Sequence, residues 1–406
     1  MSTRLKYCIV STSTCVTILL LLGSVIGQGA SPDETYKHIG VFTDVVSRIQ
    51  SEYVEEPDMK SVTLGALNGM LEAIDPFASY LNAEQYKDYL KNKDAQRANV
   101  GMVLSKKFGY VGVVGVIAGS PAAKAGFSTG DMIESIGGVA TRDMPLAYAS
   151  LLMEGDPGST LELSVVRVQN PEPSSVKLVR ANISIPAVES RMLAGQVGYV
   201  KIYGLGSTEL GQAKTALESL EKQGAQKLML DVRNCAVGTP EDGIALANLF
   251  LNKGGLITYL RGQRVPRKDF DADPAKAITS LPMVVLTNRG TADGSEIAAA
   301  ALQGDKRAQV VGERTYGDAS MRRAITMDDG GAIILSVAKY YSPDGKAIQD
   351  TGVTPQTLVA EPEPQVDVDE NGEPLNTVQE PAPQPQKKVE DDPIVKKALD
   401  VLAGKV

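Results

Sequence analysis

The sequence predicts a mixed α/β fold with additional helices near both ends of the chain. Residues 209–223 have apolar side chains at helical spacing and lie between two short apolar runs, residues 198–202 and 227–232, that are typical of strands. Residues 282–323 read as strand, turn, helix, strand and turn. Strands that alternate with helices in this way indicate an α/β core.

Charge is concentrated in one segment of the 406-residue chain, a length that predicts two to three domains. The net charge is −8, and residues 361–392 alone contain ten Asp or Glu and two Lys. The rest of the chain is therefore neutral overall and has no basic patch, so we expect no nucleic-acid partner. The acidic segment is also rich in Pro, which predicts a disordered or extended linker.

Histidine and cysteine are too scarce for several kinds of site. His38 is the single histidine, so a Ser-His-Asp triad would have to use it, and a zinc site built from histidines is improbable. Cys8 and Cys15 lie in the N-terminal apolar run, which leaves Cys235 as the one cysteine in the body of the chain. An even disulfide framework is absent, which fits a bacterial envelope protein that relies on its core. We expect no metal and no cofactor.

The N-terminus, residues 1–30, has the pattern of an export signal. Arg4 and Lys6 precede a largely apolar run, residues 7–26, and Gly27-Gln-Gly offers a cleavage site with small residues. The run is also long enough to span a bilayer uncut. Cleaved signal and membrane anchor both stay open, and both place the rest of the chain outside the cytoplasm, in the periplasm or tethered to the inner membrane. Residues 31–96 then show helical spacing.

Residues 97–185 resemble a PDZ domain. The signature is Gly119-Ser-Pro-Ala-Ala-Lys-Ala-Gly-Phe-Ser-Thr-Gly-Asp-Met-Ile, preceded by a strand at residues 111–116. The resemblance implies a loop whose backbone N–H groups bind the terminal carboxylate of a peptide, while the peptide adds as a strand. It assigns this role to Val100, Gly101, Met102 and Val103. The alternative is a PDZ domain that only packs internally.

The turn before the helix of residues 294–303 contains the candidate site. Asp293, followed three residues later by Glu296, predicts a capping box that opens this helix. Residues 286–323 resemble the carboxyl-terminal processing peptidases, and the likeness implies a crotonase-like mixed α/β core at residues 186–360. In that family a Ser nucleophile, a Lys base 25 residues later and an orienting Gln occupy the places of Asp293, Asp318 and Arg322. All three positions have changed here.

The oxyanion loop of that family has changed as well. The resemblance assigns this loop to Val237, Gly238 and Gly294. Family members read Asn-Pro-Gly-Gly where this chain reads Asn234-Cys-Ala-Val-Gly, so Val237 adds bulk where backbone should face a substrate. The sequence therefore predicts a catalytically inactive homologue that binds C-terminal tails of envelope proteins as a scaffold or regulator. The alternative is an active serine-type endopeptidase that processes such tails.

Other interpretations of the site stay open. In one interpretation Asp293 and Asp318 share a proton as in aspartic proteases, and in another they form an ion cluster with Arg322, Arg323 or a metal ion. Cys235 is a second candidate nucleophile, although no histidine is placed to activate it. Asp293 also fits a plain helix N-cap. Ser295 should face away from Asp293, because two residues turn a helix by roughly 200°.

The last segment, residues 393–406, predicts a short helix. Its apolar face consists of Ile394, Ala398, Leu399 and Leu402. A helix of this length is marginal alone, so we expect it to dock on another element. The family resemblance implies that the terminal helices build a dimer interface, in a homodimer or in a pair with an active relative.

Overall fold

The computed structural model describes residues 32–93, 97–107, 109–142, 144–168, 170–361 and 388–405. The predicted signal or anchor, residues 1–30, and residues 362–387 of the predicted linker lie outside the described residues. Within the described ranges, no helix combines the length and the apolarity needed to cross a membrane. The chain divides into two compact units, residues 1–64 and 65–406.

The first unit consists, as far as it is described, of helix α2 (Pro32–Glu52) and the start of helix α3 (Met59–Glu72). The apolar side of α2 is largely open to solvent. Ile39, Phe42 and Val45 are 55%, 43% and 50% exposed. The helical prediction for this region is confirmed, although one short strand, β1 (Ser79–Leu81), follows α3. That strand pairs with a core strand far along the chain, a long-range contact that local spacing does not reveal.

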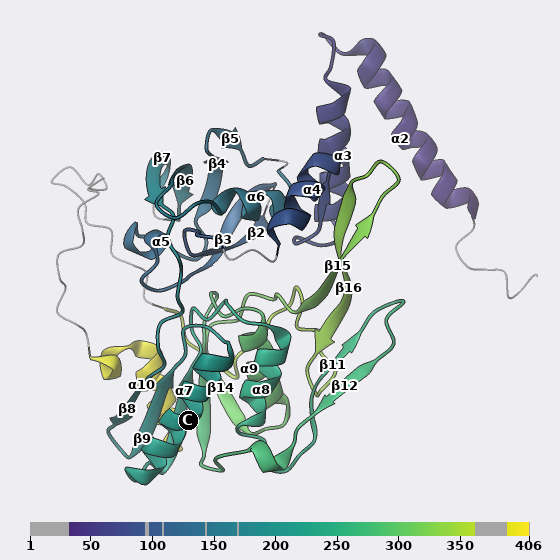
Figure 1. The fold of residues 1–406 in the computed structure, drawn as a ribbon. Coiled ribbons are helices and arrows are strands. Elements are labelled where there is room, and N and C mark those ends of the chain that lie inside the picture. The colour runs from purple at the N-terminus through teal and green to yellow at the C-terminus, as the bar shows by residue number, and fades with distance from the viewer. Residues whose placement is uncertain are drawn as a thin grey trace, which may run out of the picture. The chain divides into compact units, whose positions relative to one another are not determined.

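A six-stranded antiparallel sheet forms the predicted PDZ domain (Figure 1). Its path is β2-β3-β4-β6-β7, and β5 pairs with β4. The bounds are β2 Met102–Lys107, β3 Tyr110–Val116, β4 Met132–Ile136, β5 Val139–Ala140, β6 Thr160–Arg167 and β7 Asn170–Val179, with helices α5 Pro121–Lys124 and α6 Leu146–Met153. The predicted strand at residues 111–116 is thus confirmed as β3.

The core contains a second six-stranded sheet in the order β17-β14-β13-β10-β9-β8, parallel except for the β8–β9 pair. Its strands are β8 Glu189–Leu193, β9 Val197–Lys201, β10 Lys227–Asp231, β13 Met283–Thr287, β14 Ala308–Gly312 and β17 Thr357–Leu358. Helix α7 (Ser207–Lys222) begins two residues before the predicted start, and α9 (Gly294–Gly304) begins as predicted.

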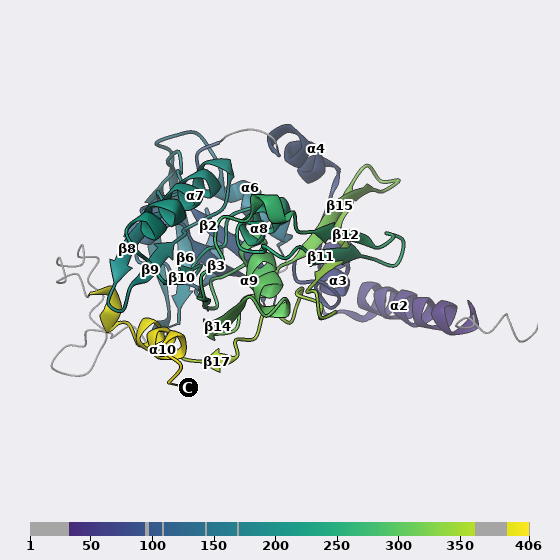
Figure 2. The same ribbon diagram turned by 90° about the horizontal axis from the view of Figure 1, so that it is seen from below.

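Side chains alternate between the two faces of this sheet, as a strand requires. On β10, Leu228 and Leu230 join the core under α7, α8 (Pro240–Asn248) and α9, whereas Met229 joins the opposite core with helix α10 (Pro393–Leu402). Figure 2 shows α10 and α7 on opposite sides of the strands. The C-terminal helix therefore docks on the chain's own sheet.

A third, five-stranded sheet adjoins the site. Its path is β1-β16-β11-β12, and β15 also pairs with β16. The bounds are β11 Leu256–Arg261, β12 Lys268–Asp271, β15 Ser320–Thr326 and β16 Ala332–Tyr341. Helix α4 (Ala83–Asn92) and the short 3₁₀ turns η1 (Pro274–Lys276) and η2 (Val389–Asp391) complete the described elements. Because β15 begins two residues after Asp318, this sheet fixes one side of the candidate site.

Candidate active site

Asp293 is the N-cap of α9, as predicted, but its backbone is unusual. Its φ and ψ are 55° and −127°, a region that residues with a Cβ rarely occupy. Its N–H donates to Glu296 Oε2 at 3.2 Å, which is the contact that the predicted capping box requires. A strained residue held in a tight strand-to-helix turn is typical of a functional position. The structure thus places Asp293, which the resemblance assigns to the nucleophile position, in a strained turn.

Glu296 has a larger role than the sequence indicated. It is fully buried and accepts hydrogen bonds from Thr315 Oγ1, from Gly317 N at 2.7 Å and from Asp318 N at 2.8 Å. One carboxyl therefore connects the start of α9 to the loop that carries Asp318. Burial raises the pKa of Glu296 to about 8. The capping-box pattern was the one sequence signal for Glu296, and it does not predict the hydrogen bonds to the loop of residues 315–318.

Asp318 is buried and paired with Arg322, whose Nη2 donates to Asp318 Oδ1. The guanidinium carbon of Arg322 lies 4.2 Å from the centre of the Phe77 ring, in a cation–π contact. Of the predicted ion cluster, the pair of Asp318 with Arg322 is present, and Asp293 forms no ion pair with Arg322. Burial raises the pKa of Asp318, while the charge of Arg322 acts in the opposite direction.

The surroundings of Asp293 favour the protonated form of its carboxyl. Burial, followed by the negative charge of Asp318, raises its pKa to about 8, although Arg322 acts to lower it. A protonated carboxyl is a poorer nucleophile than a carboxylate, which is itself weak toward amides. Asp318 meanwhile binds a guanidinium, which does not favour a proton shared between the two aspartates.

The two substitute nucleophiles lie inside the protein. Ser295 Oγ is 2.6 Å from the carbonyl oxygen of Cys235 and 2.7 Å from that of Ala292, and the residue is 1% exposed. Ser295 is thus buried, and its hydroxyl is bonded to the backbone of the loops at residues 234–238 and 288–293. Cys235 is fully buried in the core, and burial raises the pKa of its thiol to about 12. Neither side chain is available to attack a peptide.

The predicted oxyanion loop does lie beside the start of α9. A Cβ placed on Gly294 would lie 2.3 Å from Thr239 O, so this approach requires glycine. Leu205 N donates to Val237 O at 2.7 Å, and Gly238 lies against the Leu205 side chain. The structure therefore brings Val237, Gly238 and Gly294 together, with a half-buried valine side chain in the loop.

The predicted peptide-binding residues begin the outer strand of the PDZ sheet. Val100 is buried and Gly101 has a φ of 80°, where a Cβ would lie 2.3 Å from Ser120 Cβ. Met102 and Val103 open β2, which the sheet order places at an edge. Gly101 N–H, however, donates to Asn99 Oδ1 at 2.8 Å. One of the N–H groups assigned to carboxylate binding is therefore already occupied.

The PDZ domain packs on the loops of the candidate site. Val103 and Val114 of the PDZ sheet share a small apolar cluster with Ala236 and Ala292 of the core. Tyr316, two residues before Asp318, donates or accepts a hydrogen bond with Ser105 of β2. A cavity of about 950 Å³ lies between the two parts, lined among others by residues 105–106 of the PDZ domain and 312–317 of the core.

Comparison with known proteins agrees with this arrangement. Residues 196–359 match peptidase family S41, and residues 112–167 match the PDZ domain. The carboxy-terminal-processing protease of Bartonella bacilliformis is 32% identical over 335 residues, which cover 82% of this chain and 77% of the relative. This chain belongs to peptidase family S41. The carboxy-terminal processing protease CtpA of Bacillus subtilis is 30% identical to this S41 chain over 367 residues, covering 89% and 78% of the two chains.

A solved structure extends the family assignment to the fold. The photosystem II D1 C-terminal processing protease has a TM-score of 0.65 and 26% identity to this S41 chain, and the match covers 79% of this chain and 92% of the other. The predicted fold class, a PDZ domain with an S41 peptidase core, is thereby confirmed.

Proposed function

We propose that this S41 homologue binds C-terminal protein tails through its PDZ domain and does not cleave them. The observation that carries the proposal is the side-chain chemistry at the strained turn before α9. Peptide cleavage by this family's dyad needs a hydroxyl beside a neutral amine. Here the first position holds Asp293, a carboxyl whose pKa is raised to about 8, and the second holds Asp318 paired with Arg322.

Binding is supported by the PDZ sheet. Strand β2 lies at the edge of its sheet, where an extended peptide can add by main-chain hydrogen bonds. The adjoining cavity between residues 105–106 and 312–317 offers space for the rest of a tail. The bound partner would be a free C-terminal carboxylate on an envelope protein, because the N-terminal sequence pattern directs this chain out of the cytoplasm.

Association with a second chain forms part of the proposal. The exposed apolar side chains of α2, among them Ile39, Phe42 and Val45, suit a partner helix in a homodimer or in a pair with an active relative. In either assembly the chain would act as a scaffold or regulator.

The second candidate function is that of an active endopeptidase that processes tails. Two observations favour it: the strained turn at Asp293 is retained, and both quoted relatives are named as proteases. This candidate requires a nucleophile other than the Ser of the family, and the two nearest substitutes, Ser295 and Cys235, are buried.

One peptide experiment separates the two functions. A peptide with a free C-terminus and its C-terminally amidated twin are titrated into the purified protein, and each mixture is then examined by mass spectrometry after prolonged incubation. We expect the free-carboxylate peptide to bind more tightly than the amidated control, and both peptides to stay intact. Equal binding of the two peptides, or no binding, would remove tail recognition, and cleavage of either would favour the second candidate.

A further inference from the structure

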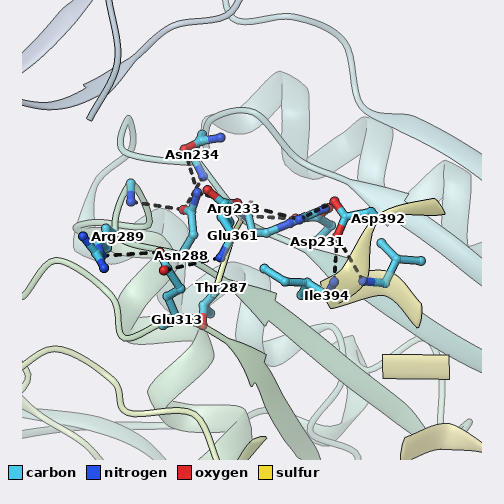
Figure 3. A network of polar contacts seen from close by, with 12 residues as sticks. Asp231, Arg233, Asn234, Thr287, Asn288, Arg289, Glu313, Glu361, Asp392 and Ile394 are labelled. Atoms are coloured by element: carbon cyan, nitrogen blue, oxygen red, sulfur yellow. Dashed lines mark hydrogen bonds and ion pairs between the residues drawn. The ribbon is translucent and has the colours of Figure 1, made fainter. Parts of the chain in front are cut away.

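Arg233 joins the candidate site to the C-terminal helix. It is the second residue after β10 and directly precedes the loop of residues 234–238. Its Nη2 donates to Asp231 Oδ2 at 2.7 Å, and its Nη1 donates to Asp392 Oδ2 at 2.7 Å and lies 3.7 Å from Glu361 Oε1 (Figure 3). The guanidinium is largely buried. One arginine thus binds acidic groups from three separate parts of the chain.

The two carboxylate oxygens of Asp392 accept hydrogen bonds from different partners. Oδ1 accepts from Ile394 N at 2.8 Å and from Val395 N at 3.2 Å, which caps the start of α10, while Oδ2 binds Arg233. Behind this cap, Ile394, Val395 and Ala398 are fully buried against the sheet. At the other end of α10, Lys227 Nζ donates to Leu402 O at 2.7 Å. The position of α10 is therefore defined at both of its ends.

Asn288 extends the same network to the second loop of the site. Its Nδ2 donates to Asn234 Oδ1 at 2.8 Å and to Glu361 Oε1 at 3.0 Å (Figure 3). Its Oδ1 accepts from Asn234 N at 2.9 Å and from Gly290 N at 3.1 Å. Asn288 is 2% exposed, whereas its partners Asn234 and Glu361 reach the solvent. The loops at residues 234–238 and 288–293 are thereby both bonded to the network that contacts α10 through Arg233.

The charges of the network keep Arg233 in place. Burial acts to raise the pKa of Asp231, but Lys201 and Arg233 hold that pKa below its ordinary range, so the carboxylate stays charged. Burial raises the pKa of Glu361. Asp231 occupies one side of the Arg233 guanidinium, so Nη1 is left to bind Asp392. Loss of Asp392 as a partner therefore changes the surroundings of Arg233, which directly precedes the loop of residues 234–238.

We propose that docking of α10 positions the loops at residues 234–238 and 288–293, with Arg233 and Asn288 as the positioning residues. The Arg233 network, defined as Asp231, Arg233, Asn234, Asn288, Glu361 and Asp392, transmits the position of the helix. This coupling does not depend on whether the site cleaves peptides, so it stands or falls separately from the proposed function.

The test uses Asp392→Asn, which keeps a good N-cap residue and removes the charge that binds Arg233. The matched control is Asp391→Asn, because Asp391 is an exposed neighbour that pairs with Lys396 at 3.7 Å. Hydrogen exchange is followed in the two loops and in α10. We expect exchange in both loops to accelerate by about fivefold or more in Asp392→Asn alone. Unchanged exchange in the loops would overturn the proposal.

Cys235 provides a second measurement, since it is buried and lies in the first of the two loops. Its labelling by a maleimide is located by peptide mass spectrometry, which separates it from Cys8 and Cys15. Labelling should be faster in Asp392→Asn than in Asp391→Asn. A second variant, Ile394→Asp, undocks α10 by placing a charge in its buried face. If α10 is released and neither loop responds in exchange or labelling, the coupling is refuted.

Discussion

Helices α9 and α10 of this protein both begin at an aspartate, and the two aspartates differ in backbone conformation and in their contacts. Asp392 has an ordinary extended backbone with φ and ψ of −63° and 126°, caps α10 with one oxygen and binds Arg233 with the other. Asp293 has φ and ψ of 55° and −127°, and burial together with Asp318 raises its pKa to about 8. Each cap also has an arginine nearby, but Arg322 binds Asp318 and not the cap itself.

The difference shows that capping of α9 does not explain the backbone conformation of Asp293. A helix N-cap stabilises by about 1 kcal/mol, and a residue in a sparsely populated backbone region costs about 1–3 kcal/mol. The surrounding turn, fixed by Glu296 and by the close contact of Gly294 with Thr239, imposes the strain. The conformation of the turn is therefore set by its surroundings and not by the side chain of Asp293.

The largest effect should come from Arg322→Ala. This change leaves Asp318 buried without its cation and removes the stacking on Phe77, so we expect a loss of about 3 kcal/mol in the free energy of unfolding. Chemical denaturation measures it. The control is Arg322→Ala combined with Asp318→Asn, which should recover most of the loss. A loss below about 0.5 kcal/mol in the single variant would show that the ion pair is not structural.

Asp392→Ala should have the next largest effect. It removes both the cap of α10 and the partner of Arg233, and we expect the free energy of unfolding to fall by about 2 kcal/mol. The matched change at the other helix, Asp293→Ala, should cost far less, since it also removes a half-buried carboxyl beside Asp318. Equal losses at the two positions in denaturant titrations would abolish the contrast between the caps.

Substitution by glycine should change the stability in opposite directions at the two caps. Asp293→Gly should raise the stability by about 1 kcal/mol, because glycine tolerates a positive φ. Asp392→Gly should lower it, because that residue has a negative φ and loses a charged partner. The melting temperatures of both variants decide the matter. A fall in the melting temperature of Asp293→Gly would mean that the turn is not strained.

The stability should also depend on pH, as a slope and not as a single loss. A carboxyl whose pKa is raised on folding binds its proton more tightly in the folded state, so its contribution to stability falls as pH rises from about 4 to about 8, by at most about 1.4 kcal/mol per pH unit. Asp293→Asn removes this contribution. The stability of Asp293→Asn relative to the natural protein should therefore increase over that range and level off above it. A constant difference between pH 4 and 9 would contradict the raised pKa.

Much of the fold could be predicted from the sequence, because local patterns specify it. Turn glycines and apolar spacing gave the PDZ strand at residues 111–116, the helix that begins at Gly294 and the short C-terminal helix. Strand β1 and the pairing of its residues with β16 were missed, since a three-residue strand inside a helical region has no local signal. The surface on which α10 docks could not be predicted either, because an amphipathic helix indicates that one face is buried but not which element covers it.

The residues of the candidate site could be predicted, but their contacts could not. The positions of Asp293, Asp318 and Arg322 followed from motif spacing, and the inward direction of Ser295 followed from helical geometry. The contact of Arg322 with Phe77 and the bonds of Glu296 to residues 315–318 join segments distant in sequence, so no spacing predicts them. The occupied N–H of Gly101 depends on the rotamer of Asn99, which is also set by tertiary structure.

The most direct test of the central claim compares the natural protein with the variant Asp293→Ser, Asp318→Lys, Arg322→Gln in the hydrolysis of unfolded casein from pH 4 to 9. Loss of a nucleophile or its base costs a peptidase on the order of 10⁶ in rate. We predict that the natural protein shows no hydrolysis at any pH, and that the variant gains activity if the frame still supports catalysis. Hydrolysis by the natural protein would contradict the claim, and its pH optimum would show whether the two aspartates have taken over the chemistry.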